Sequence, residues 1–203
     1  MSAKIYVEGG GDQKKLKTKC RRAFSKFFEK AGFKGKMPKI VACGSRRNAY
    51  DDFCTAIRTS AANEFPFLLV DSEAPVSASH KNQPWAHLKK QDGWTKLSDV
   101  LDTQAHLMVQ VMETWFLADV AELETFFGKD FKSAQLPKSK NIESLSKKDI
   151  IQSLKKASEK TQKGEYGKGA HSFDILENID PQKVTDASKW ANRLFEVLRK
   201  EIG

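Results

Sequence analysis

Short apolar runs alternate with helical patterns along the first half of the chain. Four runs predict β-strands, at residues 5–7, 40–43, 66–70 and 107–112. The third is uninterrupted, as expected for a strand covered on both faces. Apolar residues recur at helical spacing in the segments that follow the first, second and fourth runs, at residues 16–31, 49–57 and 116–127. This order is typical of a parallel sheet with right-handed crossovers.

The remaining segments predict an excursion and a helical end. Residues 74–103 form a polar stretch that is too long for a simple connection, and we expect it to contain some helix. Ser146 can cap one helix, and Asp180-Pro181 opens another that runs to Ile202. We therefore expect an α/β core over residues 1–127 and a mainly helical part over 128–203, packed together as a single compact domain.

Composition narrows the class of protein. The chain has 203 residues, of which 39% are hydrophobic, and this excludes general disorder. Its 35 basic and 26 acidic residues give a formal charge of +9, which favours a polyanionic partner or serves solubility. The sequence shows no membrane span and no secretory signal, and its three cysteines have no CxxC spacing. A soluble cytoplasmic protein is expected.

Acidic residues follow three of the predicted strands. Glu8 comes after the first strand, Asp71 and Glu73 after the third, and Glu113 after the fourth. The carboxyl ends of parallel strands meet at one edge of the sheet, so these side chains are expected to share a crevice. Side chains two apart on an extended segment point the same way, which would let Asp71 and Glu73 converge on one ion.

A divalent cation fits such a group of acids. Carboxylates crowded together raise one another's pKa, and a cation relieves that conflict. Oxygen ligands without cysteine or a histidine pair favour Mg²⁺ or Mn²⁺ over zinc. The glycines after Glu8 allow a phosphate to approach the backbone closely.

Each acid also has a simpler interpretation. Asp12 lies just before the first predicted helix, where it serves either as an N-cap or as a metal ligand. The Asp71-Ser72-Glu73 triplet is either a ligand pair or a turn before Pro75. Glu113 either completes the acidic site or starts the helix near Trp115, whose indole is expected in the core.

The spacing of these motifs resembles the Toprim fold of topoisomerases, primases and overcoming-lysogenisation-defect nucleases. The matching strings are Val7-Glu8-Gly9 and Val70-Asp71-Ser72-Glu73. Further strings resemble a bacterial Toprim-related family of unassigned function, namely residues 111–119, Gly167-Lys168 and Ile179-Asp180-Pro181. That resemblance covers most of the chain, and it implies a Rossmann-like sheet and an ATPase partner in a defence setting.

The resemblance also implies roles for individual residues. Glu8 would be the general acid/base or first metal ligand, with Asp71 and Glu73 as magnesium ligands and Asp12 supporting a second metal. Lys168, in a glycine-flanked loop, would clamp the scissile phosphate or remain a solvated lysine. One departure is that the usual triplet ends in aspartate, whereas this chain has Glu73, which puts the metal preference in doubt.

Basic residues near the predicted crevice suggest a track for nucleic acid. The candidates are Arg46, Arg47, Lys15, Lys19, Arg22, Lys89 and Lys90. Arg46 and Arg47 follow the second strand, on the same edge as the acids. Trp85 or Trp94 could stack on an unpaired base. The alternative is that these charged helix faces only keep the protein in solution.

Three functions remain open at this point. The first is a metal-dependent nuclease of Toprim type that hydrolyses DNA or RNA. The second is a non-catalytic nucleic-acid-binding or regulatory subunit of an ATPase complex, since the chain itself contains no GxxxxGK[ST] loop. The third is a small-molecule phosphotransferase, which is disfavoured because Glu8 stands where aspartyl phosphatases have their nucleophile.

Overall fold

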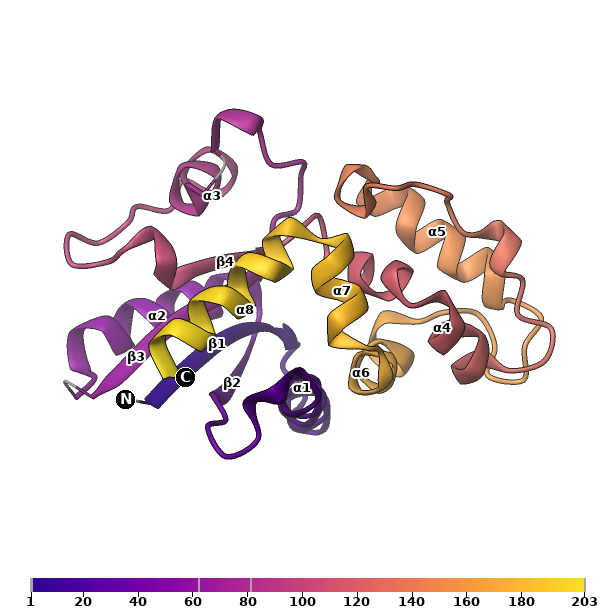
Figure 1. The fold of residues 1–203 in the computed structure, drawn as a ribbon, viewed down its shortest axis with the longest axis horizontal. Helices are drawn as coiled ribbons and strands as arrows, with labels where there is room; N and C mark the ends of the chain where they lie inside the picture. Colours follow the sequence, from indigo (N-terminus) through magenta and orange to yellow (C-terminus); the bar gives the residue numbers. More distant parts are fainter. Residues whose placement is uncertain (1, 62, 81, 203) are drawn as a thin grey trace.

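A four-stranded parallel sheet forms one side of the protein, and the helices within residues 120–187 form the other (Figure 1). The computed structural model describes residues 2–61, 63–80 and 82–202. The strands are β1 (Ser2–Gly10), β2 (Lys39–Gly44), β3 (Glu64–Asp71) and β4 (Ala105–Met108). Their order is β2-β1-β3-β4, and every neighbouring pair is parallel. The predicted α/β class with a parallel, Rossmann-like sheet is confirmed.

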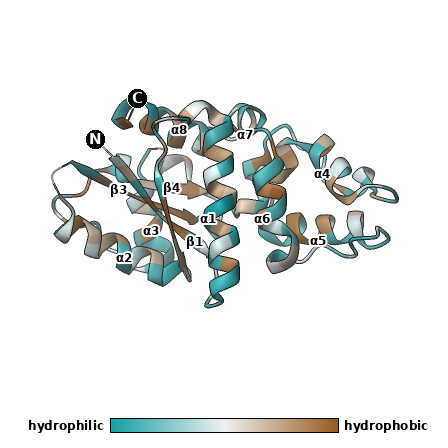
Figure 2. Cartoon of the chain, turned by 90° about the horizontal axis from the view of Figure 1, so that it is seen from below, coloured by the Kyte–Doolittle hydropathy of each residue, from teal (hydrophilic) through white to brown (hydrophobic). Residues whose placement is uncertain are grey.

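Helices cover both faces of the sheet. On one face lie α1 (Lys14–Phe28) and α8 (Lys189–Ile202), and on the other lie α2 (Arg46–Thr59) and α3 (Pro84–Asp92). Figure 2 shows hydrophobic residues, in brown, on strands of the sheet and on helices that pack against it. This arrangement explains why the third apolar run is uninterrupted.

The residues of β3 alternate between two hydrophobic cores. Phe67 and Leu69 belong to the core beneath α1 and α8, whereas Leu68 and Val70 belong to the core beneath α2 and α3. All four are fully buried. Burial of each such side chain contributes about 1.5–3 kcal/mol relative to exposure, so β3 is strongly held at the centre of the sheet.

The fourth strand differs from its predicted extent. It ends at Met108, and residues Met112–Ala118 form the 3₁₀ segment η4 before helix α4 (Val120–Phe127). The apolar residues at 109–112 that suggested a longer strand are buried beside η4 instead of continuing the sheet. An apolar run shows burial without fixing the backbone conformation, and this is why the strand boundary was wrong.

The C-terminal part contributes four helices, namely α5 (Lys147–Ser158), α6 (Lys168–Asn178), α7 (Pro181–Ala187) and α8. Ser146 caps α5 as predicted, because its Oγ accepts from the backbone N–H of Asp149 at 3.1 Å.

The expectation of one helix from Pro181 to Ile202 is wrong. The chain leaves helical conformation at Ser188, where φ is −124° and ψ is 115°. The Ser188 hydroxyl accepts from the N–H of Ala191 at 3.0 Å and so caps α8 separately.

Shorter helical segments complete the fold. They are η1 (Glu29–Phe33), η2 (Ala78–His80), η3 (Asp102–Gln104), η5 (Ser133–Gln135) and η6 (Ile142–Ser144). The polar stretch 74–103 therefore contains helix, as expected, in α3 and η2. Among the helices in the part of the chain described, none combines the length and apolar character that crossing a membrane requires.

Helices α1 and α6 lie side by side and run in the same direction (Figure 2). Ion pairs join them: Lys19 pairs with Asp174 at 2.8 Å, and Arg22 pairs with Glu177 at 2.7 Å and with Asp174 at 3.4 Å. Near their starts, a Cβ added at Gly169 would lie 3.8 Å from Leu16 Cδ1. Both helices therefore begin at the same end of the molecule, beyond the carboxyl ends of the strands.

The strand order places a topological switch point between β1 and β3. The connection after β1 leads through α1 on one face, and the connections after β2 and β3 lead through α2 and α3 on the other. At such a point the connections diverge and leave a crevice at the carboxyl ends of the two strands. The site described next lies there.

Candidate metal centre

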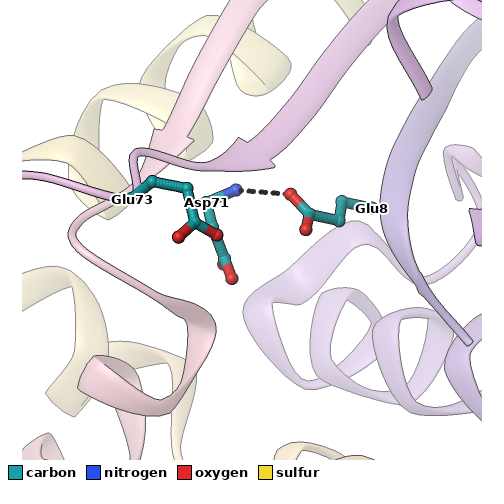
Figure 3. A group of neighbouring side chains, drawn as sticks. All are labelled: Glu8, Asp71 and Glu73. Atoms are coloured by element: carbon teal, nitrogen blue, oxygen red, sulfur yellow. Dashed lines mark hydrogen bonds between the residues drawn. The ribbon is translucent and has the colours of Figure 1, made fainter. Parts of the chain in front are cut away.

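Three carboxylates meet at the carboxyl ends of β1 and β3. One oxygen each from Glu8, Asp71 and Glu73 lies within 4.8 Å of the others (Figure 3). Glu8 belongs to β1, Asp71 is the last residue of β3, and Glu73 follows two residues later. We call these three residues the acid cluster. The sequence-based expectation that they share one crevice agrees with this geometry.

Glu73 reaches the cluster by a turn. Its φ is 60°, in the left-handed region that glutamate rarely adopts, and its N–H donates to the carbonyl of Gln110 at 2.9 Å. His87 Nε2 lies 2.8 Å from the carbonyl of Ser72 and holds the same turn from α3. The expected reason for convergence, alternation along an extended strand, is therefore wrong, although the two carboxylates do converge.

Backbone amides orient two members of the cluster. Glu8 Oε2 accepts from the N–H of Asp71 at 3.3 Å, and Asp71 Oδ1 accepts from the N–H of Met112 at 2.8 Å. Within the described chain, Glu8 Oε1 and Glu73 Oε1 accept no hydrogen bond. Each of these two acids therefore keeps an oxygen free to bind an external group.

Three cations face the acid cluster, and each is the first residue of a helix. Arg46 opens α2 and contacts Glu8 at 3.4 Å; Lys147 opens α5 and pairs with Glu73. Lys168 opens α6, with Nζ 3.5 Å from Asp71 Oδ2. Helix starts carry positive partial charge, so a cation there is unfavourable unless an anion compensates it. The acids supply that anion.

Burial perturbs the ionisation of the cluster. It raises the pKa of Asp71 to about 8, against the opposing effect of the Lys168 ammonium. Burial also raises the pKa of Glu8, although Arg46 and Lys168 counteract it. Burial alone would lower the pKa of Lys168, but the surrounding carboxylates, led by Asp71, raise it above its ordinary value. The site thus favours bound positive charge.

A cavity of about 200 Å³ opens beside the acid cluster. Its walls include Glu8, Asp71, Lys168 and the glycine turn Gly9–Gly11. Gly44 also lines it, with φ at +90°, and a Cβ there would lie 2.4 Å from the carbonyl oxygen of Gly11. Backbone of the glycine turn and of Gly44 therefore forms part of this wall, where a ligand can approach the main chain closely.

Glu113 lies beside the cluster without joining it. Its side chain is fully buried, and Oε1 accepts from the hydroxyl of Tyr166 at 2.8 Å. Its Oε2 makes no hydrogen bond to any described residue, but lies 3.7 Å from Lys168 Nζ. Glu113 lies in the first turn of η4, as the second interpretation expected, and from there it contacts Lys168 without joining the acid cluster. Trp115 is fully buried in the core, as predicted.

Asp12 takes neither of its expected roles. It is exposed in the turn before α1, whose N-cap is Gln13, and no side chain caps this helix. Asp12 is also outside the acid cluster. The glycine turn carries the chain past the cluster before Asp12 is reached, so a spacing of four residues does not return its side chain to Glu8.

Arg46 is turned inward. Besides Glu8, its guanidinium binds both carboxylate oxygens of Asp92, at 2.9 and 2.7 Å, and stacks over Trp94 at 4.9 Å. Arg46 therefore ties the α3 excursion to the acid cluster. Trp94 and Trp85 are 5% and 4% exposed. Their expected role as exposed base-stacking residues is wrong, because both indoles complete the core beneath α2 and α3.

Some of the other predicted basic residues pair with acids of the protein, and some do not. Arg47 pairs with Asp51 at 2.9 Å on the surface, and Lys19 and Arg22 are joined to α6. Three others are exposed, namely Lys15, Lys89 and Lys90. These three have no acidic partner within 4.0 Å among the described residues. Lys168 begins a helix instead of lying in a loop, with Gly167 as its N-cap.

Three residues of this site escaped the sequence analysis. They are Lys147, Asp92 and Tyr166, which contact Glu73, Arg46 and Glu113 respectively. The available signal was the lysine directly after the Ser146 cap, since cations are unfavourable at that helical position. Local pattern gives no comparable signal for Asp92 or Tyr166, whose partners are distant in sequence.

Comparisons with known proteins complete the description. No curated protein and no solved structure matched this chain. One family matched over residues 7–199, a span that includes the acid cluster, Arg46, Lys147 and Lys168. The chain therefore belongs to the family described as a domain of unknown function, DUF4276.

Proposed function

We propose that the protein is a metal-dependent nuclease of Toprim type that hydrolyses phosphodiester bonds of DNA or RNA. One observation carries the proposal. The carboxylates of Glu8, Asp71 and Glu73 converge at the switch point of a parallel sheet, beside a cavity lined by backbone and by Lys168. Ligands of open α/β sheets bind at such points. A divalent cation held by these acids would, together with Lys168, suit a substrate whose reacting group is an anion.

The donor set fits Mg²⁺ or Mn²⁺. All three groups are carboxylates, the ligands that hard divalent cations prefer, and Glu8 and Glu73 each keep an oxygen free of hydrogen bonds within the described chain. Asp71 Oδ2 faces only the ammonium of Lys168 among described groups. When bound, the ion supplies Lewis acidity toward a phosphoryl oxygen and makes water a stronger nucleophile.

The chain's own residues provide the remaining parts of the reaction. The side chain of Lys168 is 55% exposed at the cavity wall, where its ammonium can contact a phosphate oxygen and offset developing negative charge. Glu8 lines the cavity, and its Oε1, which accepts no hydrogen bond within the described chain, either binds the ion or accepts a proton. The turn Gly9–Gly11 lets the phosphate approach the backbone. Arg46 holds Glu8 in place.

Cleavage by two carboxamide variants tests the proposal. Glu8→Gln and Asp71→Asn remove the charge needed for the ion with little change in size, so magnesium- or manganese-dependent cleavage of DNA and RNA should be lost. Glu64→Gln is the matched control, because Glu64 is a half-buried acid that pairs with Lys4. Glu64 is the first residue of β3, so it lies at the end of the strand opposite the acid cluster. Parent-like cutting by the first two variants would refute the assignment.

A second candidate is a non-catalytic nucleic-acid-binding or regulatory subunit of an ATPase complex. The observation that favours it is the pairing of the acids with Arg46, Lys147 and Lys168, since these cations neutralise the cluster without an ion. The ATPase partner and the defence setting belong to both proposals through the Toprim resemblance, and the cytoplasmic location belongs to both through the cysteine spacing. A protein that binds nucleic acid equally well in chelator and cuts none with Mg²⁺ or Mn²⁺ would support this candidate.

A further inference from the structure

The positive charge of the protein is concentrated near its N-terminus. Residues 1–47 contain 14 lysines and arginines against three acids, whereas the remaining residues contain 21 basic and 23 acidic side chains. The entire basic excess therefore belongs to β1, α1, β2 and the start of α2. Helix α1 itself contains seven basic residues and no acid. A polyanion that binds this protein by charge should meet this part of the fold first.

The basic residues of α1 form two stripes with different surroundings. One stripe, which includes Lys19 and Arg22, is neutralised by the acids of α6. The other consists of Lys14, Lys17 and Arg21, which share a face at helical spacing, and we call it the α1 stripe. No acidic side chain of the described chain lies within 4.0 Å of these three, and the one side-chain hydrogen bond among them runs from Arg21 to Thr18.

The α1 stripe is unfavourable for α1 taken alone. Like charges three and four residues apart repel each other on a helix, and cations in the first turn oppose the positive end of the helix dipole. The helices α2, α5 and α6 also open with a cation, but each of those contacts the acid cluster. Lys14 and Lys17 have no such partner inside the described protein. An anion that compensates them can therefore come only from outside the described protein.

The stripe lies at the edge of the cavity. A Cβ added at Gly44 would lie 3.1 Å from Lys17 Cε, and one added at Gly10 would lie 2.7 Å from Lys17 Cα. Lys17 therefore lies against Gly10 and Gly44, two glycines of the cavity wall. An extended polyanion that follows the stripe would be led to Glu8 and Asp71.

We infer that the α1 stripe binds the phosphate backbone of a nucleic-acid strand and guides it to the acid cluster. This inference rests on the proposed function for its purpose, but binding can be measured without cleavage. The partner is a polynucleotide because the stripe offers three cations spaced along one helix face, which suits the repeated phosphates of a strand. Each contact releases counterions, so binding should weaken steeply with salt.

The experiment compares two triple variants that each lose three positive charges, the first from the α1 stripe and the second from a control surface. Lys14→Gln/Lys17→Gln/Arg21→Gln neutralises the stripe. Lys34→Gln/Lys36→Gln/Lys39→Gln is the matched control, because these three are also exposed, also lie in residues 1–47 and have no acidic partner within 4.0 Å in the part of the chain that the structure describes. Lys34 and Lys36 precede β2 and Lys39 begins it, so all three lie toward the amino-terminal ends of the strands, away from the acid cluster.

Binding of a fluorescent oligonucleotide is measured in chelator as a function of salt, with single-stranded and duplex probes tested separately. The stripe variant should bind about tenfold more weakly than the parent, and its slope of log affinity against log salt should be smaller by about 2, for three lost contacts to a single strand. The control should stay within about twofold of the parent. Circular dichroism checks that both variants are folded.

The outcomes separate this inference from the proposed function. Equal weakening in both triple variants, or no binding of any oligonucleotide by the parent, would overturn the assignment of the stripe. Stripe-dependent binding without metal-dependent cleavage would leave the stripe standing and remove the nuclease. If cleavage depends on Glu8 but both triple variants bind and cut like the parent, the nuclease stands and the assignment of the stripe is overturned.

Discussion

Lys168 provides the sharpest test of the electrostatics of the site. Lys168→Met removes the ammonium but keeps an unbranched apolar chain. In the parent, Nζ lies 3.5 Å from Asp71 Oδ2 and 3.7 Å from Glu113 Oε2. The side chains of these two acids are 3% and 0% exposed. The substitution therefore leaves two buried carboxylates without their nearest positive charge.

The magnitude follows from these distances. With an effective dielectric constant of about 20, each attraction amounts to about 4–5 kcal/mol before solvation is counted. The ammonium is about half exposed, so water screens both pairs, and the desolvated acids offset part of the gain. We expect a net loss of about 1–3 kcal/mol in the free energy of unfolding.

Urea unfolding above about pH 8, the raised pKa of Asp71, measures this loss with the carboxyl ionised, first in chelator and then with Mg²⁺. A divalent ion should replace part of the missing charge, so Mg²⁺ should raise the unfolding midpoint more for Lys168→Met than for the parent. An ion present at 100 times its Kd stabilises the folded state by about 2.7 kcal/mol. Lys156→Met is the control, since Lys156 is exposed on α5 with no acidic partner within 4.0 Å among described residues.

Two results would refute this reasoning. If Lys168→Met unfolds at the same urea concentration as the parent in chelator, the ammonium does not stabilise the buried acids. If Mg²⁺ shifts the midpoint of neither protein, or shifts the Lys156→Met control by the larger amount, the acids do not hold the ion.

Two further predictions concern the backbone and the core. Gly44→Ala should lower the free energy of unfolding, measured in urea, by about 2 kcal/mol or more, because the new Cβ would overlap the Gly11 carbonyl. Gly93→Ala is the control, since Gly93 also has a positive φ but its Cβ would meet open space, and it should cost about 1 kcal/mol. Equal losses in the two variants would contradict the clash. Burial, with Arg193 adding to it, lowers the pKa of His106 to about 3. As the pH falls, His106 of the unfolded chain binds a proton at about pH 6.5, whereas His106 of the folded protein binds one only at about pH 3. The contribution of His106 to the free energy of unfolding is therefore complete above about pH 6.5, and it is lost at about 1.4 kcal/mol per pH unit as the pH falls toward 3. His106→Gln should flatten the dependence of urea stability on pH between about 6 and 4, and an unchanged slope would contradict the assignment.

Much of the fold follows from local sequence. Apolar runs ended by glycine or acid located β1, β2 and β3, and the uninterrupted run of β3 correctly indicated helices on both faces. The acids at the strand ends also followed, because parallel strands bring their carboxyl ends to one edge. These features depend on residues close together in the chain, which a local pattern can describe.

The partners of the acids could not be predicted in the same way. Arg46 looked like a residue for nucleic acid, yet Asp92, which is 46 residues away, turns it inward. Tyr166 and Glu113 meet across 53 residues in the buried interior. Such pairs are set by how the excursion and the C-terminal helices pack on the sheet. Periodicity of hydrophobic residues carries no information on that choice.

Binding of Mn²⁺ to the purified protein tests the central claim most directly. Calorimetric titration of the parent should show saturable binding at a single class of site. Glu8→Gln and Asp71→Asn should lose that binding, whereas Glu64→Gln should retain it. Parent protein that takes up no Mn²⁺, or variants that bind it as tightly as the parent, would contradict a cation site at the ends of β1 and β3.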